Sequence, residues 1–281
     1  MFKQIVSKSH KFLSYLTLGL GLLILSGNSL AQRNLTLQDE DKLAEQVFQV
    51  LASEIALQRG EIALAYQTYM SLAKNSKDPQ MAQRAMEIAI AGKSPGSSLE
   101  AARLWDELAG PKSTTSREVL ITLLMLNGKW EESVEPSINY LSKLKPADRE
   151  KFLLQWQSLI SRSTNDDQGI RAFTQIIGAF KPLPNSPELL FIYALGQEKD
   201  KNYPEMEAAL KLIIKKNPND KNALNALGYS YADRNIKLQE AYGLISKAYQ
   251  LSPGDAYILD SLAWVNFRLG NTQLAASQLS K

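Results

Sequence analysis

Three prolines in the second half of the chain are about one repeat length apart, and this spacing constrains the fold more than any other feature. Pro184, Pro218 and Pro253 are separated by 34 and 35 residues. A fixed period of this length is typical of stacked helix pairs, in which a proline after each pair blocks continuation of the helix. Because one pair cannot bury its own apolar face, each pair is stabilised by its neighbours.

Small and large apolar residues recur at fixed places in each unit. The unit that ends at Pro253 carries Leu224, Leu227, Gly228 and Tyr231 in its first helix, then Ala241, Ile245 and Ala248. The two units before it carry Trp156, Leu159, Ala172, Ile176 and Ala179, and Leu190, Ala194, Met206 and Leu210. A last unit, with Leu259, Leu262, Ala263, Gly270, Ala275 and Leu279, stops at Lys281 inside its second helix. Small residues let two helices approach closely while larger ones fill the gap, and this pattern resembles the tetratricopeptide repeat (TPR).

The same rhythm continues more weakly towards the N-terminus. Turns at 59–61, 93–98 and 127–129 each predict a further helix pair, although Pro136 falls in the first turns of one predicted second helix. We therefore expect an all-α, right-handed solenoid of about seven stacked TPR pairs, the last incomplete. No stretch alternates with period two, so a sheet is not expected.

The domain organisation follows from the same pattern. Degenerate TPR-like pairs are predicted over 43–146 and TPR repeats over 150–281, in a solenoid that is continuous or has a joint near 145–148.

The first 31 residues have the three parts of a secretory signal peptide. A basic start is followed by an apolar run over 12–25 and by small residues at Ser29 and Ala31, which predicts cleavage after Ala31. A short linker, 32–42, would follow. The alternative is an uncleaved membrane anchor, but a run of roughly 14–16 residues is short for the ~20 that span a bilayer. The exported chain is expected in the periplasm.

Composition narrows the chemistry of the exported chain. The chain has no Cys, and its only His is His10, inside the predicted leader. Thiol nucleophiles, imidazole bases and Cys or His metal ligands are therefore excluded, and we expect no cofactor and no metal. The excess of 32 basic over 29 acidic residues comes from Lys3, Lys8 and Lys11. A neutral exported chain is not expected to bind nucleic acid.

Two regions resemble a particular family more than a generic repeat. They are NALNALGYSYADR (222–234) with ILDSLAWVNFRLG (258–270), and the early stretch 47–89. Both resemble a proteobacterial family of TPR proteins of the periplasm and outer membrane. That family includes a lipoprotein adaptor that holds a carboxyl-terminal processing protease and its cell-wall hydrolase substrates. The resemblance implies a periplasmic scaffold, and more narrowly a protease adaptor.

Two departures from the family pattern limit what the resemblance implies. Leu25-Ser26-Gly27 resembles the start of a lipoprotein signal, but Asn28 replaces the lipid-bearing Cys, which argues against direct outer-membrane attachment. The chain also ends sooner than family members do, which suggests truncation. Membrane association would then be indirect, or through an uncleaved leader.

The repeat phase predicts a binding groove on the first helices, where such folds bind extended peptides or helices. The groove-facing residues are Phe191, Asn225, Tyr229, Asp233, Asp260, Trp264, Phe267 and Arg268. Tyr229, Trp264 and Arg268 are the strongest candidates, because aromatic and Arg side chains dominate interface hot spots. The alternatives are that Trp264 and Phe267 pack on a further helix, and that Asn225 and Asp233 belong to a solvated face.

A non-catalytic interaction scaffold of the bacterial envelope is the function these features favour. A carboxylate-based envelope or cell-wall enzyme stays open, and it would need two acids about 5–9 Å apart in a closed pocket. The acidic pairs Glu131-Glu132 and Asp166-Asp167 lie at predicted turns or helix starts, where the helix dipole explains them. A structural protein that assembles through its exposed last helix is a third possibility.

Overall fold

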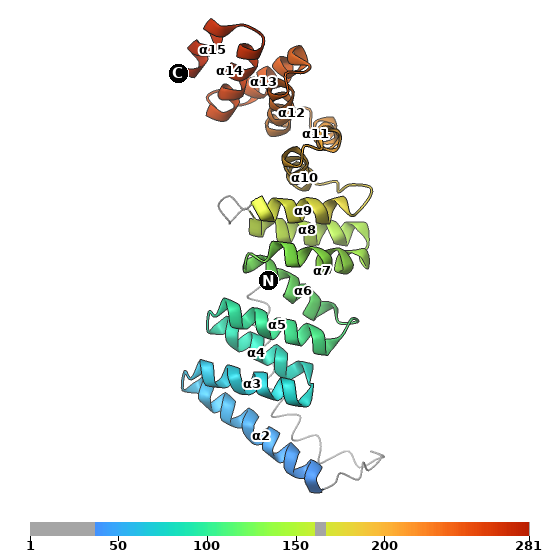
Figure 1. Ribbon diagram of the computed structural model, residues 1–281, viewed down its shortest axis with the longest axis vertical. Coiled ribbons are helices and arrows are strands. Elements are labelled where there is room, and N and C mark those ends of the chain that lie inside the picture. Colours follow the sequence, from blue (N-terminus) through green and yellow to red (C-terminus); the bar gives the residue numbers. More distant parts are fainter. Residues whose placement is uncertain (1–36, 161–166, 281) are drawn as a thin grey trace. The chain divides into compact units, whose positions relative to one another are not determined.

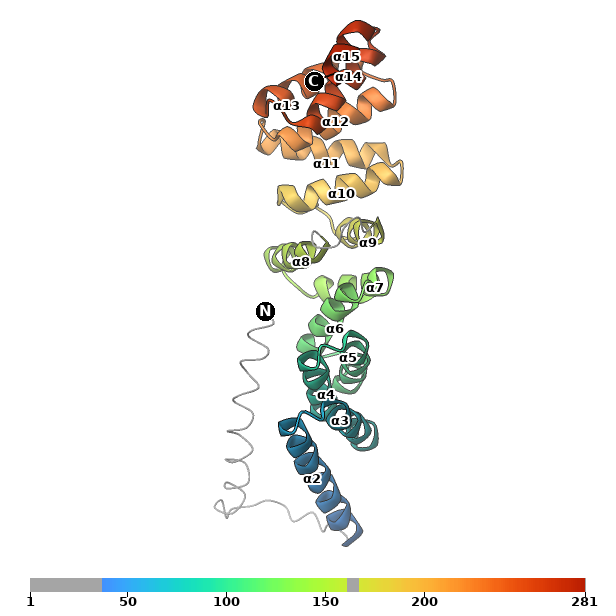
Figure 2. The same cartoon turned by 90° about the vertical axis from the view of Figure 1, so that its left-hand side faces the viewer.

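The computed structural model describes residues 37–160 and 167–280 (Figures 1 and 2). These ranges contain fourteen helices and no strand, which confirms the all-α prediction and its count of about seven helix pairs. The chain divides into two compact units, 1–123 and 124–281, so the boundary falls within α6 (Thr114–Leu126). The predicted signal peptide lies outside the described residues. None of the described helices combines the length and apolarity needed to cross a membrane.

Unit 1 contains four helices before α6. They are α2 (Leu37–Gln58), α3 (Ile62–Ser76), α4 (Pro79–Ala91) and α5 (Pro95–Ala109), and each packs against the next (Figure 1). Because α2 begins at Leu37, residues 37–42 of the predicted linker are helical. A fork of hydrogen bonds fixes α2 to α4: Arg84 Nε donates to Glu54 Oε1 at 3.0 Å, and Arg84 Nη2 to Glu54 Oε2 at 2.9 Å.

Unit 2 contains the remaining helices. They are α7 (Trp130–Ser142), α8 (Pro146–Ile160), α9 (Asp167–Gly178), α10 (Pro187–Lys199), α11 (Tyr203–Lys216), α12 (Lys221–Asp233), α13 (Leu238–Leu251), α14 (Ala256–Arg268) and α15 (Thr272–Leu279). Successive helices from α9 to α15 pack on one another, and α12 also packs on α14 (Figure 2). Helix α7 continues through Pro136, so the predicted second helix of this pair forms despite the proline.

The turns within the described pairs share one backbone conformation. Each contains a residue with positive φ at the same place, namely Gly60, Lys93, Gly128, Lys201, Asn235 and Gly270. The next residue then bonds back across the turn, as Glu61 N does to Ala56 O and Asn271 N to Asn266 O, both at 2.9 Å. This is the Schellman arrangement, which satisfies carbonyls at the end of the first helix. The turn before α13 has a second such residue, Lys237 at φ 47°, which is the extra residue predicted there.

The small residue at the helix crossing is buried as the repeat pattern predicts. A Cβ on Gly228 would lie 2.6 Å from Ile245 Cγ1 and 3.0 Å from Ala241 O, so α12 and α13 are too close for a side chain there. The other predicted positions of this unit are buried as well: Leu224, Leu227, Tyr231, Ala241, Ile245 and Ala248. In the unit that ends at Pro184, the predicted small residue Ala179 is not buried, because it follows the end of α9 and is exposed.

Candidate functional site

A hollow of about 680 Å³ opens between three helices near the end of unit 2. Its lining residues are Tyr229 and Asp233 of α12, Asp260, Ala263, Trp264 and Phe267 of α14, and Thr272, Ala275, Ala276 and Leu279 of α15. We call this the α12–α15 hollow. It brings together five of the eight residues predicted for the groove.

Aromatic rings form one wall of the hollow. Trp264 and Phe267 are three residues apart on α14 and therefore share a helix face. Their ring centroids are 5.7 Å apart and the rings are inclined by 21°, so they stack. Phe267 is 51% exposed and Tyr229 is 42% exposed. These are unusually open positions for large aromatic side chains, and such side chains dominate interface hot spots when a partner covers them.

Carboxylates make the same wall acidic. Asp233 and Asp260 are both exposed, and each lines the hollow beside Tyr229. Burial raises the pKa of the Tyr229 hydroxyl, and the charges of Asp233, Asp260 and Glu198 raise this pKa further. The hydroxyl is therefore protonated at neutral pH and can donate a hydrogen bond. The local electrostatic field favours a cation.

Arg268 does not line the hollow, although it was among the strongest predicted contacts. Its Nε donates to Ala232 O at 3.1 Å and its Nη2 to Asp233 O at 2.6 Å. These carbonyls belong to the end of α12, which lacks intrahelical donors. The guanidinium carbon also lies 5.0 Å from the centroid of the Trp264 ring. Arg268 therefore ties α14 to α12 and supports the indole from one side.

Two other predicted residues lie apart from the hollow. Phe191 lines a separate space of about 290 Å³ formed by residues of α8, α10 and α11 and of the start of α12. Asn225 Oδ1 is buried and has no hydrogen-bond partner among the described residues. The structure thus concentrates the predicted groove residues at α12 and α14.

Helix α15 supplies lining residues that the repeat phase did not predict. The groove was assigned to first helices alone, whereas Thr272, Ala276 and Leu279 come from a second helix. The small residues Ala275 and Ala276 ahead of Leu279 let α15 approach α14 and still leave a hollow. In the sequence, these two small residues followed by a large apolar one were the sign that α15 would line a hollow.

A charged cluster fixes the end of α12 on the side of α11. Glu207 accepts hydrogen bonds from Tyr231 Oη at 2.8 Å and from Arg234 Nη2 at 3.0 Å. Lys211 Nζ and Lys237 Nζ also donate to it, at 3.1 and 3.3 Å. Burial alone would raise the pKa of Glu207, but these hydrogen bonds lower it to about 2. The cluster holds α12 in place and so positions Tyr229 and Asp233.

The other acidic residues have structural explanations. Glu131 and Glu132 lie in the first turn of α7, and Asp167 lies in the first turn of α9, where the helix dipole favours acids. Asp166 lies outside the described residues. Among the described residues, no group of three or more His, Asp or Glu could hold a metal ion.

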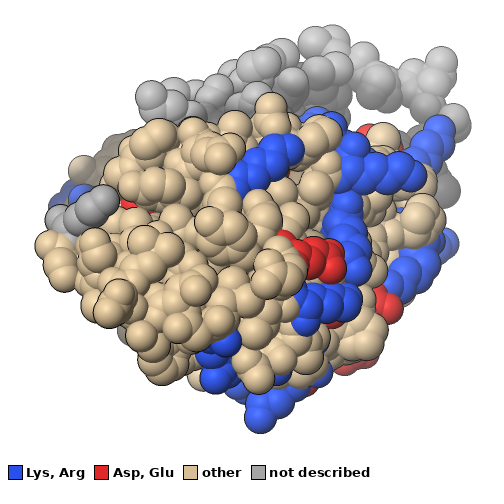
Figure 3. Space-filling model, turned by 90° about the horizontal axis from the view of Figure 1, so that it is seen from above, with Lys and Arg blue, Asp and Glu red and all other residues tan. Residues whose placement is uncertain are grey.

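The end of unit 2 that carries α14 and α15 shows a broad uncharged area in a space-filling view (Figure 3). Lys and Arg side chains gather towards one side of that view. The uncharged area is compatible with contact to another protein, since interface cores are depleted of charge.

The repeat length, the positive-φ residue that the turns share and the small buried residue at the helix crossing are the features of tetratricopeptide repeats. Over 119 residues, 42% of this chain, it is 38% identical to a TPR repeat-containing protein of Pseudomonas aeruginosa. The chain spans only 20% of the length of that curated relative. No protein-family model matches the chain.

Two solved structures are similar to this chain at low sequence identity. The C-terminal part of a TPR repeat-containing protein from Cytophaga hutchinsonii is 15% identical, with a TM-score of 0.47 over 81% of this chain and 91% of that chain. The MamA protein is 16% identical, with a TM-score of 0.44 over 59% of this chain and 88% of that chain.

Proposed function

We propose that the chain is a non-catalytic scaffold that binds a segment of a partner protein in the α12–α15 hollow. The observation that carries this proposal is the aromatic wall, in which the exposed Tyr229 and Phe267 stand with the half-buried Trp264 beside two exposed carboxylates. A space of about 680 Å³ accommodates several side chains. Aromatic anchors in such a groove are the usual source of binding energy in protein interfaces.

The partner segment carries a basic side chain next to an apolar one. The carboxylates of Asp233 and Asp260 attract a cation, and the exposed Phe267 ring adds to that attraction. Ala276 and Leu279 on the opposite wall favour an apolar side chain. A helix with Lys or Arg one turn away from Leu or Phe places its basic side chain at the carboxylates and its apolar side chain at Ala276 and Leu279.

The site of action in this proposal is the bacterial periplasm, and the partners include a processing protease and its substrates. The three-part leader supports export, and the family resemblance of 222–234 and 258–270 supports an adaptor role. The mass of the chain recovered from the envelope tests export directly. A chain that begins at Gln32 is expected, and a chain that retains the first 31 residues would contradict cleavage after Ala31.

Affinity capture from envelope extract with three variants tests the binding site. The wild type is compared with a Tyr229→Ala, Trp264→Ala double variant and with Tyr257→Ala. Tyr257 is a matched control, because it is an aromatic residue of α14 that is 86% exposed and lies outside the hollow. Arg268 is left unchanged, since its hydrogen bonds to α12 would confuse stability with binding.

The expected result is a protein retained by the wild type and by Tyr257→Ala and lost from the folded double variant. Circular dichroism checks that each variant is folded. If all three chains retain the same proteins, the α12–α15 hollow is not the binding site. A processing protease among the retained proteins would support the adaptor role, and its absence would restrict the proposal to a scaffold.

A further inference from the structure

Helix α2 in unit 1 exposes an apolar face that the proposed function does not use. Its exposed large residues are Leu43, Val47, Phe48, Leu51 and Ile55, and Phe48 is 71% exposed. The opposite face is anchored: Ser53 and Ala56 are buried, and Arg84 holds Glu54. The exposed face is therefore fixed in place on a packed helix. Contiguous apolar faces larger than a few hundred Å² are uncommon on soluble monomers and indicate interaction sites.

The same repeat positions are buried where a preceding pair exists. Phe48, Leu51 and Ile55 on α2 correspond to Ile258, Ser261 and Val265 on α14 when the small buried residues Ser53 and Ala263 are aligned. Those three residues of α14 are all buried, and α14 packs on both helices of the pair before it. The exposed face of α2 is thus built to receive a helix.

The apolar residues of this face follow the same intervals whether α2 is traced from its N-terminus or from its C-terminus. Ala44, Phe48, Leu51 and Ile55 follow one another at intervals of four, three and four residues, and all four are exposed. Such intervals form the seam of a coiled coil. A seam that reads identically in both directions can pair with a second copy of itself in antiparallel orientation. Phe48 would then lie opposite Leu51 of the second copy, and Ala44 opposite Ile55 of the second copy.

Charges at the two ends of the seam fit the same pairing. Glu40 lies four residues before Ala44 and Arg59 lies four residues after Ile55, and both are exposed. Antiparallel pairing places Glu40 opposite Arg59 of the second copy at both ends of the seam. Parallel pairing would instead oppose Glu40 to Glu40 and Arg59 to Arg59, which like-charge repulsion disfavours.

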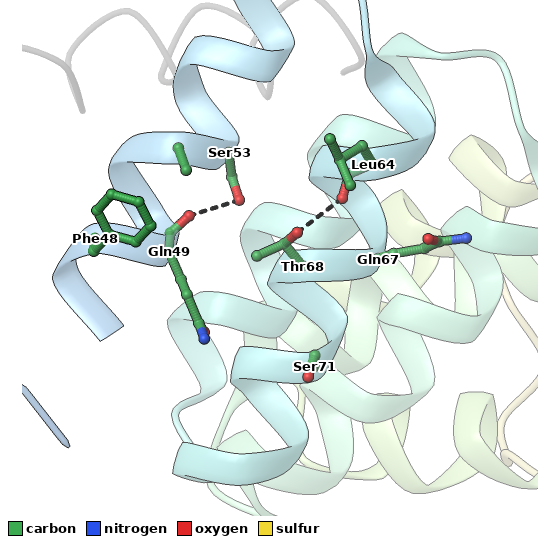
Figure 4. A pocket seen from close by; sticks show the side chains of 8 residues that line it. Phe48, Gln49, Ser53, Leu64, Gln67, Thr68 and Ser71 are labelled. Atoms are coloured by element: carbon green, nitrogen blue, oxygen red, sulfur yellow. Dashed lines mark hydrogen bonds between the residues drawn. The ribbon is translucent and has the colours of Figure 1, made fainter. Parts of the chain in front are cut away.

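A hollow of about 460 Å³ lies between α2 and α3 and is lined by residues that include Phe48 and Leu64. Figure 4 shows Gln49 and Ser53 on the side towards Leu64 and Thr68 of α3, with the Phe48 ring on the outer side of α2. The seam is therefore a different face from the one that α3 occupies.

We propose that α2 pairs antiparallel with α2 of a second copy, so that the chain forms a two-fold dimer through unit 1. An isologous contact of this kind closes on itself and leads to a dimer, not to a filament. A seam formed by one helix from each copy is small beside the roughly 1,000 Å² in total of a stable specific interface, so we expect weak association, with dissociation in the micromolar range. This surface is distinct from the α12–α15 hollow.

Sedimentation velocity over a range of concentrations tests the proposal, with the chain purified as it is exported. The wild type and a Tyr257→Glu control are expected to shift from monomer to dimer as concentration rises. A Phe48→Glu, Leu51→Glu variant is expected to stay monomeric at a concentration at least 100-fold higher. Both of its sites are exposed, so the fold is retained. A monomeric wild type, or a variant that dimerises equally well, would overturn the proposal.

Charge reversal distinguishes this register from unspecific association. Glu40→Arg and Arg59→Glu should each weaken the dimer roughly tenfold, and the two together should restore it. Because the chain has no Cys, a Glu40→Cys, Arg59→Cys variant should form a disulfide-linked dimer on oxidation, while Glu40→Cys alone should not. Cross-linking by Glu40→Cys alone would show parallel pairing. Failure of the double charge reversal to restore the dimer would overturn the antiparallel register.

Discussion

The first helices of the repeat pairs expose different faces in the two units. In unit 2, the exposed aromatic residues of α12 and α14 stand among carboxylates, and the face of α14 towards the preceding pair is buried. In unit 1, α2 exposes the equivalent of that buried face, and the residues of this face, Phe48, Leu51 and Ile55, are all apolar. First helices thus support two kinds of recognition through different faces: a mixed hollow that suits a partner segment, and a seam that suits one helix in one register.

The largest effect that this comparison predicts is that partner binding and dimerisation can be lost separately. The Tyr229→Ala, Trp264→Ala variant should lose at least about 100-fold in affinity for a captured partner, because each buried hot spot contributes about 2 kcal/mol or more. The same variant should dimerise like the wild type. Isothermal titration calorimetry and sedimentation velocity measure the two properties.

The Phe48→Glu, Leu51→Glu variant should show the reverse behaviour, with partner binding retained and dimerisation lost. If either variant loses both activities while folded, the two surfaces are not independent.

The glycines of unit 2 give a matched pair of substitutions with opposite signs. Gly228→Ala should destabilise the chain by about 2 kcal/mol, because the added Cβ would lie 2.6 Å from Ile245 Cγ1. Gly243→Ala, in α13 with nothing within 4 Å of the added atom, should stabilise by about 0.5–1 kcal/mol. Urea unfolding of both variants tests this. Equal effects would show that α12 and α13 do not approach so closely.

The Glu207 cluster predicts a pH dependence for unit 2. The pKa of Glu207 falls from its ordinary value of 4.5 to about 2, so its stabilisation is present above pH 4.5 and is lost as the pH falls towards 2. Glu207→Gln should cost about 1–2 kcal/mol at neutral pH, since it removes hydrogen bonds to charged groups. It should also flatten the dependence of the unfolding free energy on pH between pH 4.5 and 2.

Glu54 in unit 1 is the counterpart of Glu207 and allows the same pH test there. Burial opposes ionisation of Glu54, but hydrogen bonds from Arg84 and Tyr69 lower its pKa overall. Glu54→Gln should therefore also reduce stability above the ordinary pKa of the carboxyl. Because Glu54 ties α2 to α4, this variant should weaken the proposed dimer as well, whereas Glu207→Gln should not. Equal dimer affinity in the two variants would contradict the assignment of the seam to α2.

The carboxylates of the hollow give the smallest expected effect. Asp233→Asn and Asp260→Asn should each weaken binding of a basic partner segment by about 0.2–1 kcal/mol, because both side chains are exposed and screened. Each should also reduce the dependence of the affinity on salt. Titrations at two ionic strengths measure this, and an unchanged salt dependence would show that the partner is not bound through its basic side chain.

Sequence periodicity predicted most of the fold because it depends on local spacing. The interval between Pro218 and Pro253 fixed the repeat phase, and the phase correctly placed Gly228 and Tyr231 in the core. It also predicted the additional residue in the turn before α13, where Asn235 and Lys237 both have positive φ.

Contacts that depend on how helices pack were not predictable in the same way. Arg268 has the residue type of a hot spot, yet it bonds to carbonyls of α12 that only the packing of α14 brings near. Leu279 lines the hollow because of the way α15 packs on α14, which the repeat phase does not specify. The spacing of Phe48 and Leu51 on α2 was readable, but their exposure depends on which helices cover α2.

Site-specific photo-crosslinking tests the central claim most directly. Phe267 and, separately, Tyr257 are replaced by a photo-crosslinking residue, and the chain is irradiated in the intact envelope. Both positions are exposed on α14, but only Phe267 lines the α12–α15 hollow. We predict a protein adduct at Phe267, with the cross-linked peptide carrying Lys or Arg near an apolar residue, and no matching adduct at Tyr257. Identical adducts at both positions, or none at Phe267, would contradict binding of a partner segment in the hollow.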